Sequence, residues 1–221
     1  MRTILELLPT PYPTIQILDL GAMAVASKTE YQRLIDLGIA RVIGFEPVID
    51  ACEKLNRESK GTHQYYPSFI GDGSKRTFHL GRAPMTSSLY APNLPLCRPF
   101  QALAELMETT STSEVQTTRL DDLPDLPSID YVKMDIQGAE RDAIVGGARI
   151  LRDAMVIESE VEFVPLYVDQ PLFGDVDAAL RKLDFLFHQF RGVAGRTLKP
   201  MVIGGDTARA MSQHLWGDGV W

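Results

Sequence analysis

Short apolar runs alternate with helical patterns along most of this chain, and this alternation constrains the fold more than any other feature. Strands separated by helices build a parallel sheet that is covered by helices on both faces. We therefore predict an α/β fold with a mostly parallel sheet. The predicted strands are 15–20, 41–45, 65–70, 77–80, 129–134, 154–157 and 185–190, and the predicted helices cover 31–37, 49–60, 140–151 and 176–183.

The segment 82–113 differs from the rest of the chain because it is rich in proline, serine and threonine. It contains only one helical pattern, at 100–107. Connections of this length are uncommon in compact domains and are more often functional than structural. We predict that 82–113 forms a lid or a substrate loop. No repeat or second core pattern occurs, so we assign 1–221 to one domain with 1–14 as an N-terminal lead-in.

Composition and charge exclude several classes of protein. The formal net charge of -7 at pH 7 opposes binding to phosphate backbones and anionic lipids, so we expect neither nucleic acid nor a membrane as partner. The sequence has no long apolar run and no basic-then-apolar start, a pattern typical of a cytoplasmic protein. Its two cysteines, Cys52 and Cys97, stand far apart without clustered histidines, so we expect neither a disulfide framework nor a zinc site.

Acidic residues stand at the ends of three predicted strands. Asp19 ends the first strand, Glu46 ends the second, and Asp135 follows the strand at 129–134. In an open parallel sheet a ligand lies beyond the carboxyl ends of the strands, near the point where the strand order reverses. These three carboxylates are therefore the first candidates for a binding site.

The motifs around these residues are Asp-Leu-Gly-Ala at 19–22, Phe-Glu-Pro at 45–47 and Lys-Met-Asp-Ile-Gln-Gly-Ala-Glu at 133–140. Together they resemble the FkbM-type family of S-adenosylmethionine-dependent methyltransferases. Further similarity lies at 85–89 (Met-Thr-Ser-Ser-Leu), across 160–173 and at 213–218. The matches follow the order expected in the family, which isolated short motifs rarely do by chance.

The resemblance implies a single Rossmann-like class I methyltransferase domain with S-adenosylmethionine as cofactor. It also implies a small-molecule or glycan acceptor, with O-methylation of a sugar or of a secondary-metabolite hydroxyl as the expected reaction. The predicted cofactor-binding residues are Asp19, Gly21, Ala22, Glu46, Pro47, Ser68, Phe69 and Asp135.

Each cofactor-binding prediction has a structural alternative. Glu46 is placed to accept hydrogen bonds from both ribose hydroxyls, but it could also be a solvated loop carboxylate or a helix cap. Asp19 and Gly21 would shape the turn around the amino-acid part of the cofactor, although an Asx-turn explains Asp19 equally well. Ser68 and Phe69 follow the third strand, where this fold usually holds the adenine.

Asp135 and Glu140 are the predicted catalytic residues. Methyl transfer needs the acceptor atom in line with the methyl carbon, and a hydroxyl acceptor also needs a base. Asp135 ends a strand from which its side chain reaches the methyl group. Glu140 lies in the next helical turn and could face the same cleft, or its charge could simply favour the helix N-terminus. The same pair could hold a hard divalent cation, but we predict no metal.

Further charged residues accompany these two. Lys133 lies within a buried strand, where an unpaired ammonium group is costly, so we expect it to meet a carboxylate near the site. Glu158, Glu160 and Glu162 alternate along the chain, so they share one face that could line the acceptor pocket. The alternative is an exposed acidic edge.

One departure from the family pattern favours a second hypothesis. The family commonly has Gly-Ala-Asn-x-Gly, whereas this chain has Met23, Ala24 and Val25 after Ala22. Loss of the second glycine would keep backbone amides from approaching the cofactor closely. A catalytically degenerate methyltransferase-like binding protein is therefore the alternative function. A dinucleotide oxidoreductase is disfavoured because the full Gly-x-Gly-x-x-Gly spacing is absent.

The carboxyl end resembles the entry to the last strand of the family's sheet, yet the sequence stops where that strand would begin. We expect either 201–203 or the terminal residues to form a short antiparallel edge strand beside 185–190. A truncated edge would leave unpaired backbone groups, so we also expect a homodimer or a marginally stable domain.

Overall fold

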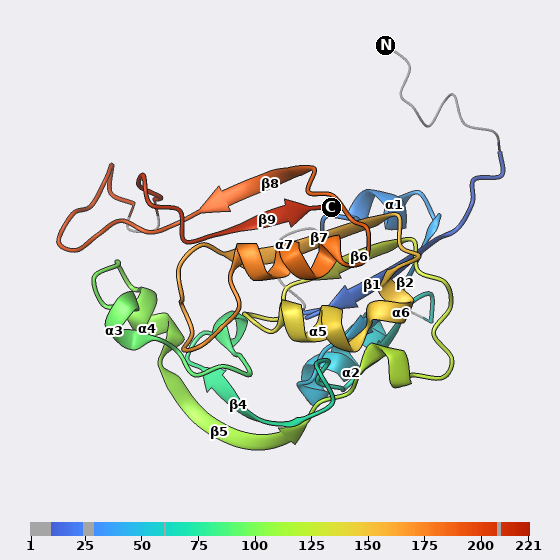
Figure 1. The fold of residues 1–221 in the computed structure, drawn as a ribbon, viewed down its shortest axis with the longest axis horizontal. Coiled ribbons are helices and arrows are strands. Elements are labelled where there is room, and N and C mark those ends of the chain that lie inside the picture. Colours follow the sequence, from blue (N-terminus) through green and yellow to red (C-terminus); the bar gives the residue numbers. More distant parts are fainter. Residues whose placement is uncertain (1–9, 24–28, 60, 207–208) are drawn as a thin grey trace, which may run out of the picture.

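The computed structural model describes residues 10–23, 29–59, 61–206 and 209–221 and shows the predicted α/β fold (Figure 1). The strand order of its main sheet is β3-β2-β1-β6-β7-β9-β8. Pairs within β3-β2-β1-β6-β7 are parallel, and β9 is antiparallel to both of its neighbours. The order reverses between β1 and β6. These strands are β1 (Ile15–Leu20), β2 (Ala40–Phe45), β3 (Gln64–Tyr66), β6 (Tyr131–Met134), β7 (Val156–Glu162), β8 (Gln189–Ala194) and β9 (Trp216–Val220).

Helices cover both faces of the sheet, which confirms the Rossmann-like arrangement. Alternate residues of β1 point to opposite faces: Leu18 and Leu20 enter the larger core, whereas Ile17 packs in a smaller one. Side chains from α5, α6 and α7 fill the larger core, and α1 contributes to the smaller one. The helices are α1 (Gln32–Asp36), α2 (Ile49–Glu58), α5 (Glu140–Gly146), α6 (Ala148–Leu151) and α7 (Phe173–Arg181).

The segment 82–113, predicted to be a lid or a substrate loop, contains several short regular elements. These are η2 (Pro84–Thr86), α3 (Leu94–Cys97), α4 (Leu103–Met107) and the first part of β5 (Thr109–Gln116), and α4 overlaps the helix predicted at 100–107. β5 pairs antiparallel with β4 (Lys75–Gly81) in a separate ribbon that curves below the main sheet in Figure 1. The sequence of β5 lacks alternating apolar residues because most of its side chains are exposed, so its strand pattern is weak.

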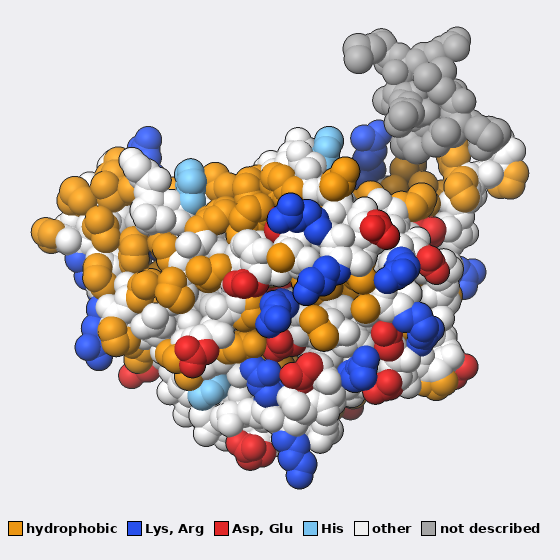
Figure 2. Space-filling view, in the orientation of Figure 1, with side chains coloured by type: hydrophobic (Ala, Val, Ile, Leu, Met, Phe, Trp, Pro, Cys, Tyr) orange, Lys and Arg blue, Asp and Glu red, His pale blue; other side chains and the backbone are white. Residues whose placement is uncertain are grey.

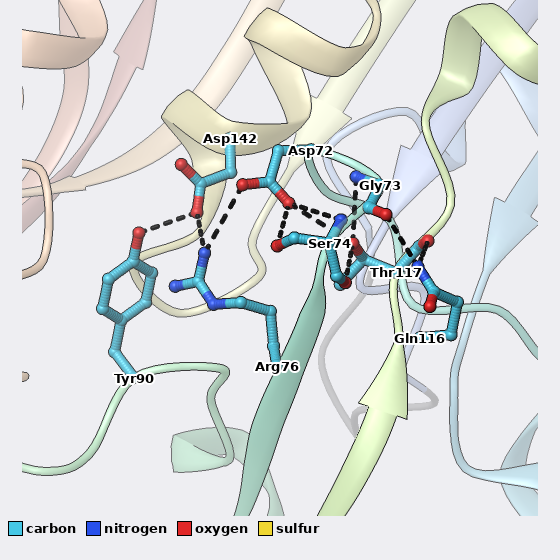
Figure 3. A network of polar contacts seen from close by, with 8 residues as sticks. All are labelled: Asp72, Gly73, Ser74, Arg76, Tyr90, Gln116, Thr117 and Asp142. Atoms are coloured by element: carbon cyan, nitrogen blue, oxygen red, sulfur yellow. Dashed lines mark hydrogen bonds and ion pairs between the residues drawn. The ribbon is translucent and has the colours of Figure 1, made fainter.

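A polar network ties this ribbon to α5 (Figure 3). The Arg76 guanidinium of β4 lies 3.1 Å from Asp142 Oδ2 on α5 and 3.7 Å from Asp72 Oδ2. The Tyr90 hydroxyl donates to the same Asp142 oxygen at 2.7 Å, and Arg76 stacks over the Tyr90 ring at 4.6 Å. Asp142 therefore joins β4 and the connection that follows it to α5.

The carboxyl end corrects our prediction of a truncated edge. The terminal residues do form the expected antiparallel strand beside the last predicted strand, because β9 pairs with β8. However, β9 is inserted between β7 and β8, so β8, which is antiparallel to β9, forms the edge. Residues 201–203 form no strand, and Ile203 makes only an isolated bridge with Asp206. Because β9 is paired on both sides, it leaves no unpaired edge to support a homodimer, and the homodimer stays a prediction.

Several boundaries also differ from the predicted ones. The third strand ends at Tyr66 rather than 70, β7 continues to Glu162, and the last predicted strand is shifted to Gln189–Ala194. The helix predicted at 140–151 is interrupted at Gly147, which separates α5 from α6. A side chain on Gly146 would lie 2.1 Å from the Gly71 carbonyl oxygen, so the end of α5 packs directly on backbone.

The face that carries α5 and α7 has no large area of a single charge sign. Figure 2 shows Lys and Arg side chains interspersed with Asp and Glu there, while apolar side chains gather toward the end that carries α3 and α4. Within the described ranges, no helix has the length and apolar character needed to span a bilayer.

Replacement of Trp221 tests the role of the carboxyl end in the core. Trp221 is 5% exposed, exchanges two backbone hydrogen bonds with Ile157 and donates from Nε1 to Asp177. Trp221→Ala should lower the free energy of unfolding by about 3–5 kcal/mol, measured by urea denaturation. Leu186→Ala, at a 77% exposed position, is the control and should change it by about 0.5 kcal/mol or less. Equal effects would show that this end does not complete the core.

Replacement of Asp142 tests the anchor of the ribbon. Asp142→Asn keeps the shape but removes the charge that Arg76 faces, so amide hydrogen exchange in β4 and β5 should accelerate about tenfold. Glu108→Gln is the control, because Glu108 pairs with Arg82 on an exposed part of the same ribbon and should change exchange by about twofold or less. Unchanged exchange in Asp142→Asn would contradict the anchor.

Candidate functional site

Two adjoining cavities lie at the carboxyl ends of β1, β2 and β6, where the strand order reverses. We call them the first cavity, of about 150 Å³, and the second cavity, of about 300 Å³. Because they share lining residues, they form one cleft with two lobes. The shared residues are Gly21, Met23, Met85, Lys133, Asp135 and Gln137. This is where ligands bind in open α/β sheets.

The first cavity lies between the ends of β2 and β3 and the β4–β5 ribbon. Glu46 and Pro47 line it from β2, and Ser68 and Phe69 line it from the turn after β3. The ribbon side contributes mostly apolar residues, together with two serines: Phe78, Leu80, Pro84, Met85, Ser87, Ser88 and Leu89. The cavity therefore combines the Glu46 carboxylate and the Lys133–Asp135 pair with apolar and aromatic walls.

Glu46 is held in a defined position within this wall. It is 2% exposed, and the Val48 N–H donates to its Oε1 at 2.8 Å. Burial raises the pKa of Glu46, and the charge of Asp19 adds to this effect. A bound hydrogen-bond donor would favour the ionised form and offset part of that cost.

The turn after β1 approaches the end of β6 so closely that only glycine fits. Gly21 has φ +85°, and a Cβ there would lie 2.0 Å from the Asp135 carbonyl oxygen. The Asp135 N–H donates to Leu20 O, and the Gly21 N–H donates to Phe45 O. Gly21 therefore brings the ends of β1, β2 and β6 together around the cleft.

Asp19 lines the second cavity with an unpaired oxygen. The Tyr31 hydroxyl donates to Oδ2, but Oδ1 is buried and accepts no hydrogen bond from any residue that the structure describes. Burial raises the pKa of Asp19, with Lys133 opposing the shift. An orphaned buried carboxylate oxygen beside a cavity suits a ligand that carries an N–H or ammonium group.

Lys133 and Asp135 lie at the junction of the two cavities. Lys133 Nζ is 3.3 Å from Asp135 Oδ2, which confirms the expectation that this buried lysine meets a carboxylate. Burial opposes the charge of Lys133, but the nearby Asp135 and Asp19 outweigh burial and raise its pKa. The lysine is therefore a fixed cation that stabilises the negative charge of its partner.

The wall of the second cavity carries Glu160 and Glu162 from β7, together with Tyr167. The Gln137 amide joins this wall to the junction: its Nε2 donates to Asp135 Oδ1 at 2.8 Å and to Glu160 Oε2 at 2.5 Å. Its Oε1 accepts from the Tyr167 hydroxyl at 2.8 Å. Two residues of the predicted glutamate face, Glu160 and Glu162, thus line a cavity, so this face is not an exposed acidic edge.

Two predicted site residues lie outside the cleft. Ala22 is buried and its N–H donates to Phe45 O, so it packs behind the turn. Glu140 is also buried, and it accepts hydrogen bonds from the backbone N–H groups of Ile136 and Gly138 at 2.9 Å each. Burial raises the pKa of Glu140 to about 7. In this arrangement Glu140 shapes the loop after β6 and does not face the cleft.

Other residues of the cleft were not assigned a role from the sequence. Gln137 and Tyr167 belong to motifs that signalled the family, but their mutual contact depends on the fold. Arg196 and Trp216 come from distant parts of the chain and reach the second cavity only after β8 and β9 have paired. Met23 lines both cavities, whereas Ala24 and Val25 lie outside the described residues. Among the described residues, no group of three or more His, Cys, Asp or Glu side chains is arranged to hold a metal ion.

Comparison with solved structures returns methyltransferases of low sequence identity. Magnesium protoporphyrin IX methyltransferase (ChlM) from Synechocystis PCC 6803, solved with bound SAM, is 10% identical with a TM-score of 0.45, covering 94% of this chain and 70% of that one. Precorrin-6y C5,15-methyltransferase from Geobacter metallireducens GS-15 is 12% identical with a TM-score of 0.48, covering 95% and 80%.

Comparison of sequences identifies the family to which the chain belongs. The chain is 30% identical over 207 residues to 2-O-methyltransferase NoeI of Sinorhizobium fredii (strain NBRC 101917 / NGR234), covering 89% of this chain and 83% of that protein. The family model for the methyltransferase FkbM domain matches residues 19–187, which contain the ends of β1, β2 and β6 that form the cleft. The chain therefore belongs to the FkbM methyltransferase family.

Proposed function

We propose that this protein is an S-adenosylmethionine-dependent O-methyltransferase that methylates a hydroxyl of a sugar or of a secondary metabolite. The observation that carries this proposal is the two-lobed cleft, whose lobes meet at Asp135 and Lys133. A cofactor in the first cavity and an acceptor in the second would bring the methyl carbon and the acceptor oxygen together at this junction.

The side chains of the first cavity fit the parts of S-adenosylmethionine. Glu46 would accept hydrogen bonds from the two ribose hydroxyls, and Phe69 with Pro47 and Ser68 would enclose the adenine. The amino-acid part of the cofactor would extend past the junction to the edge of the second cavity, where the orphaned Oδ1 of Asp19 would accept a hydrogen bond from its amino group, directly or through water. Gly21 leaves room for the backbone of the turn to approach the amino-acid part.

The residues at the junction would position the acceptor. When bound, S-adenosylmethionine supplies an electrophilic methyl group on a positively charged sulfur. Asp135 accepts hydrogen bonds from Lys133 and Gln137 and would accept another from the acceptor hydroxyl, which aligns the oxygen with the methyl carbon. Met85 and the ribbon would cover the junction and exclude water.

The lining of the second cavity supports a hydroxylated acceptor. Carboxyl, amide and phenol groups from Glu160, Glu162, Gln137 and Tyr167 supply several acceptors and donors for hydroxyl groups. NoeI is a 2-O-methyltransferase, and the similarity to it supports oxygen rather than nitrogen as the methylated atom. A screen of methyl hexosides and phenols with radiolabelled cofactor would identify the acceptor class.

A catalytically degenerate binding protein is the second candidate, because Met23 occupies the position of the family's asparagine and lines both cavities. Calorimetric titration separates the candidates. We expect S-adenosylmethionine and S-adenosylhomocysteine to bind and NAD not to bind. Cofactor binding without transfer to any acceptor in the screen would favour the degenerate protein, and absence of cofactor binding would refute the proposal.

Replacement of Glu46 tests the ribose contact. Glu46→Ala should weaken cofactor binding at least about tenfold, or about 1.4 kcal/mol, because a charge-assisted pair of hydrogen bonds is lost. Glu53→Ala, at an exposed position of α2, is the matched control and should leave the calorimetric affinity unchanged. A folded Glu46→Ala protein with wild-type affinity would remove Glu46 from the cofactor site.

Replacement of Asp135 tests the junction. Asp135→Asn keeps the size of the side chain but removes its charge, so turnover should fall about a hundredfold or more while the protein stays folded. Glu114→Gln, on the exposed face of the ribbon, is the control. Turnover of Asp135→Asn within about threefold of the wild type would place the catalytic contact elsewhere.

A further inference from the structure

The second cavity holds more acidic groups than basic ones. The carboxyl groups in this cavity and next to it differ in their hydrogen-bond and ion-pair partners. Asp135 faces both Lys133 and Gln137, whereas Glu158 on the same strand face as Glu160 is held by Arg191, which lies 2.9 Å from each of its oxygens. The Tyr131 hydroxyl also donates to Glu158 at 2.6 Å. Each of these two carboxylates therefore has a cation as a direct partner.

Glu160 lies two residues after Glu158 on β7 and has a different environment. Among the residues that the structure describes, only Gln137 donates to its carboxyl group, and it does so to Oε2. No Lys, Arg or His side chain in the described part of the chain forms an ion pair with it. Glu160 lines the second cavity beside Asp135, so its other oxygen, Oε1, is the carboxyl oxygen left to meet a ligand there.

We propose that Glu160 takes the proton of the acceptor hydroxyl during methyl transfer, with Gln137 as the positioning residue that holds it beside Asp135. This inference rests on the proposed function. The acceptor O–H bond breaks and its proton moves to Glu160. The oxygen forms a bond with the methyl carbon as the carbon–sulfur bond breaks, and that electron pair stays on sulfur.

The backbone around Gln137 supports a positioning role. Gln137 has φ +54°, a left-handed conformation that non-glycine residues rarely adopt. The Ser88 hydroxyl of the ribbon connection donates to its carbonyl oxygen at 2.5 Å, and Tyr167 contacts its side chain. A strained backbone that is held from two sides fixes the amide between the two carboxyl groups.

The electrostatic surroundings favour Glu160 as a proton acceptor. Burial raises its pKa well above the ordinary value, and the surrounding carboxylates add to the shift. A carboxylate with a raised pKa is a stronger base than an ordinary one. The charged and titratable groups that face it are Asp135 and Lys133 of β6, Glu140 of α5, Glu158 and Glu162 of β7, Asp218 of β9, and Tyr167 and Arg196 of the flanking loops.

The same geometry couples the charge of the cofactor to this proton. A positive sulfur at the junction favours the ionised form of Glu160, so cofactor binding should lower its pKa and release a proton. The neutral sulfur of S-adenosylhomocysteine exerts no such effect. The carboxyl group would thus be ionised by the incoming cofactor and protonated again by the acceptor.

Proton release can be measured without knowing the acceptor. Calorimetric titrations in two buffers of different ionisation enthalpy, from about pH 5.5 to about pH 8.5, give the number of protons released on binding. At the pH where the difference is largest, the wild type should release about half a proton more with S-adenosylmethionine than with S-adenosylhomocysteine. The two ligands carry the same amino and carboxyl groups, so the comparison corrects for the titration of those groups. Glu160→Gln should abolish this difference.

Two further variants distinguish Glu160 from its neighbours. Glu158→Gln removes a glutamate from the same strand face but outside the cleft, so it should keep the wild-type difference. Asp135→Asn removes a charge that raises the pKa of Glu160, so the difference should persist and move to lower pH by about one unit.

Once an acceptor is identified, the pH dependence of kcat gives a second measurement. In the wild type kcat should rise with pH as Glu160 ionises, and in Glu160→Gln it should fall about a hundredfold and lose this ascending limb. KM for the cofactor should change by about threefold or less. If Glu160→Gln shows the same proton release as the wild type, or the same ascending limb, this inference is overturned but the proposed function is not. A wild type that does not bind the cofactor would overturn the proposed function itself.

Discussion

The contact between the turn after β1 and the end of β6 is the constraint on which the site depends. Because Gly21 has no side chain, its Cα can lie against the Asp135 carbonyl group, and the two central strands end at the same level. The reversal of strand order at this point separates the connections that follow β1 and β6 and opens the cleft between them. Any larger residue at position 21 would push these strand ends apart and displace Asp135 from the junction.

The electrostatics of the cleft follow from this geometry. The closely packed ends of β1, β6 and β7 bring several carboxyl groups into a small volume, with Lys133 as the central cation. Buried charges of one sign are costly, and the protein offsets the cost differently at each position. Glu140 accepts two backbone amides, Glu158 meets a guanidinium, and Asp135 meets an ammonium group. Glu160 has neither a cation nor a backbone donor among the described residues, and Gln137 holds it beside Asp135.

The sequence predicted the centre of this fold better than its periphery. β1, β2 and β6 are buried apolar runs, so their positions and the acidic residues at their ends could be recognised from the pattern. Glu46, Gly21 and Asp135 indeed line the cleft. β5 escaped prediction because most of its side chains are exposed, so it has no alternating apolar pattern. β9 was expected only as one of two alternatives and at the edge of the sheet, because Gly217 and Gly219, where neighbouring groups leave no room for a side chain, weaken its strand pattern. Arg196 could not be predicted because it reaches the second cavity only through the pairing of strands distant in sequence.

The position of β9 has a consequence for the order of folding. β8 is joined to the rest of the sheet only through β9, although β8 is made first. While the chain is being synthesised, β8 has no strand to pair with until residues 216–220 have emerged, and β7 exposes one row of backbone groups in the meantime. Sheet assembly therefore ends with the insertion of a late segment between two earlier ones. The contacts that form in this step join residues far apart in the sequence, and such contacts form slowly. Until they form, the partly assembled edges are exposed to other chains.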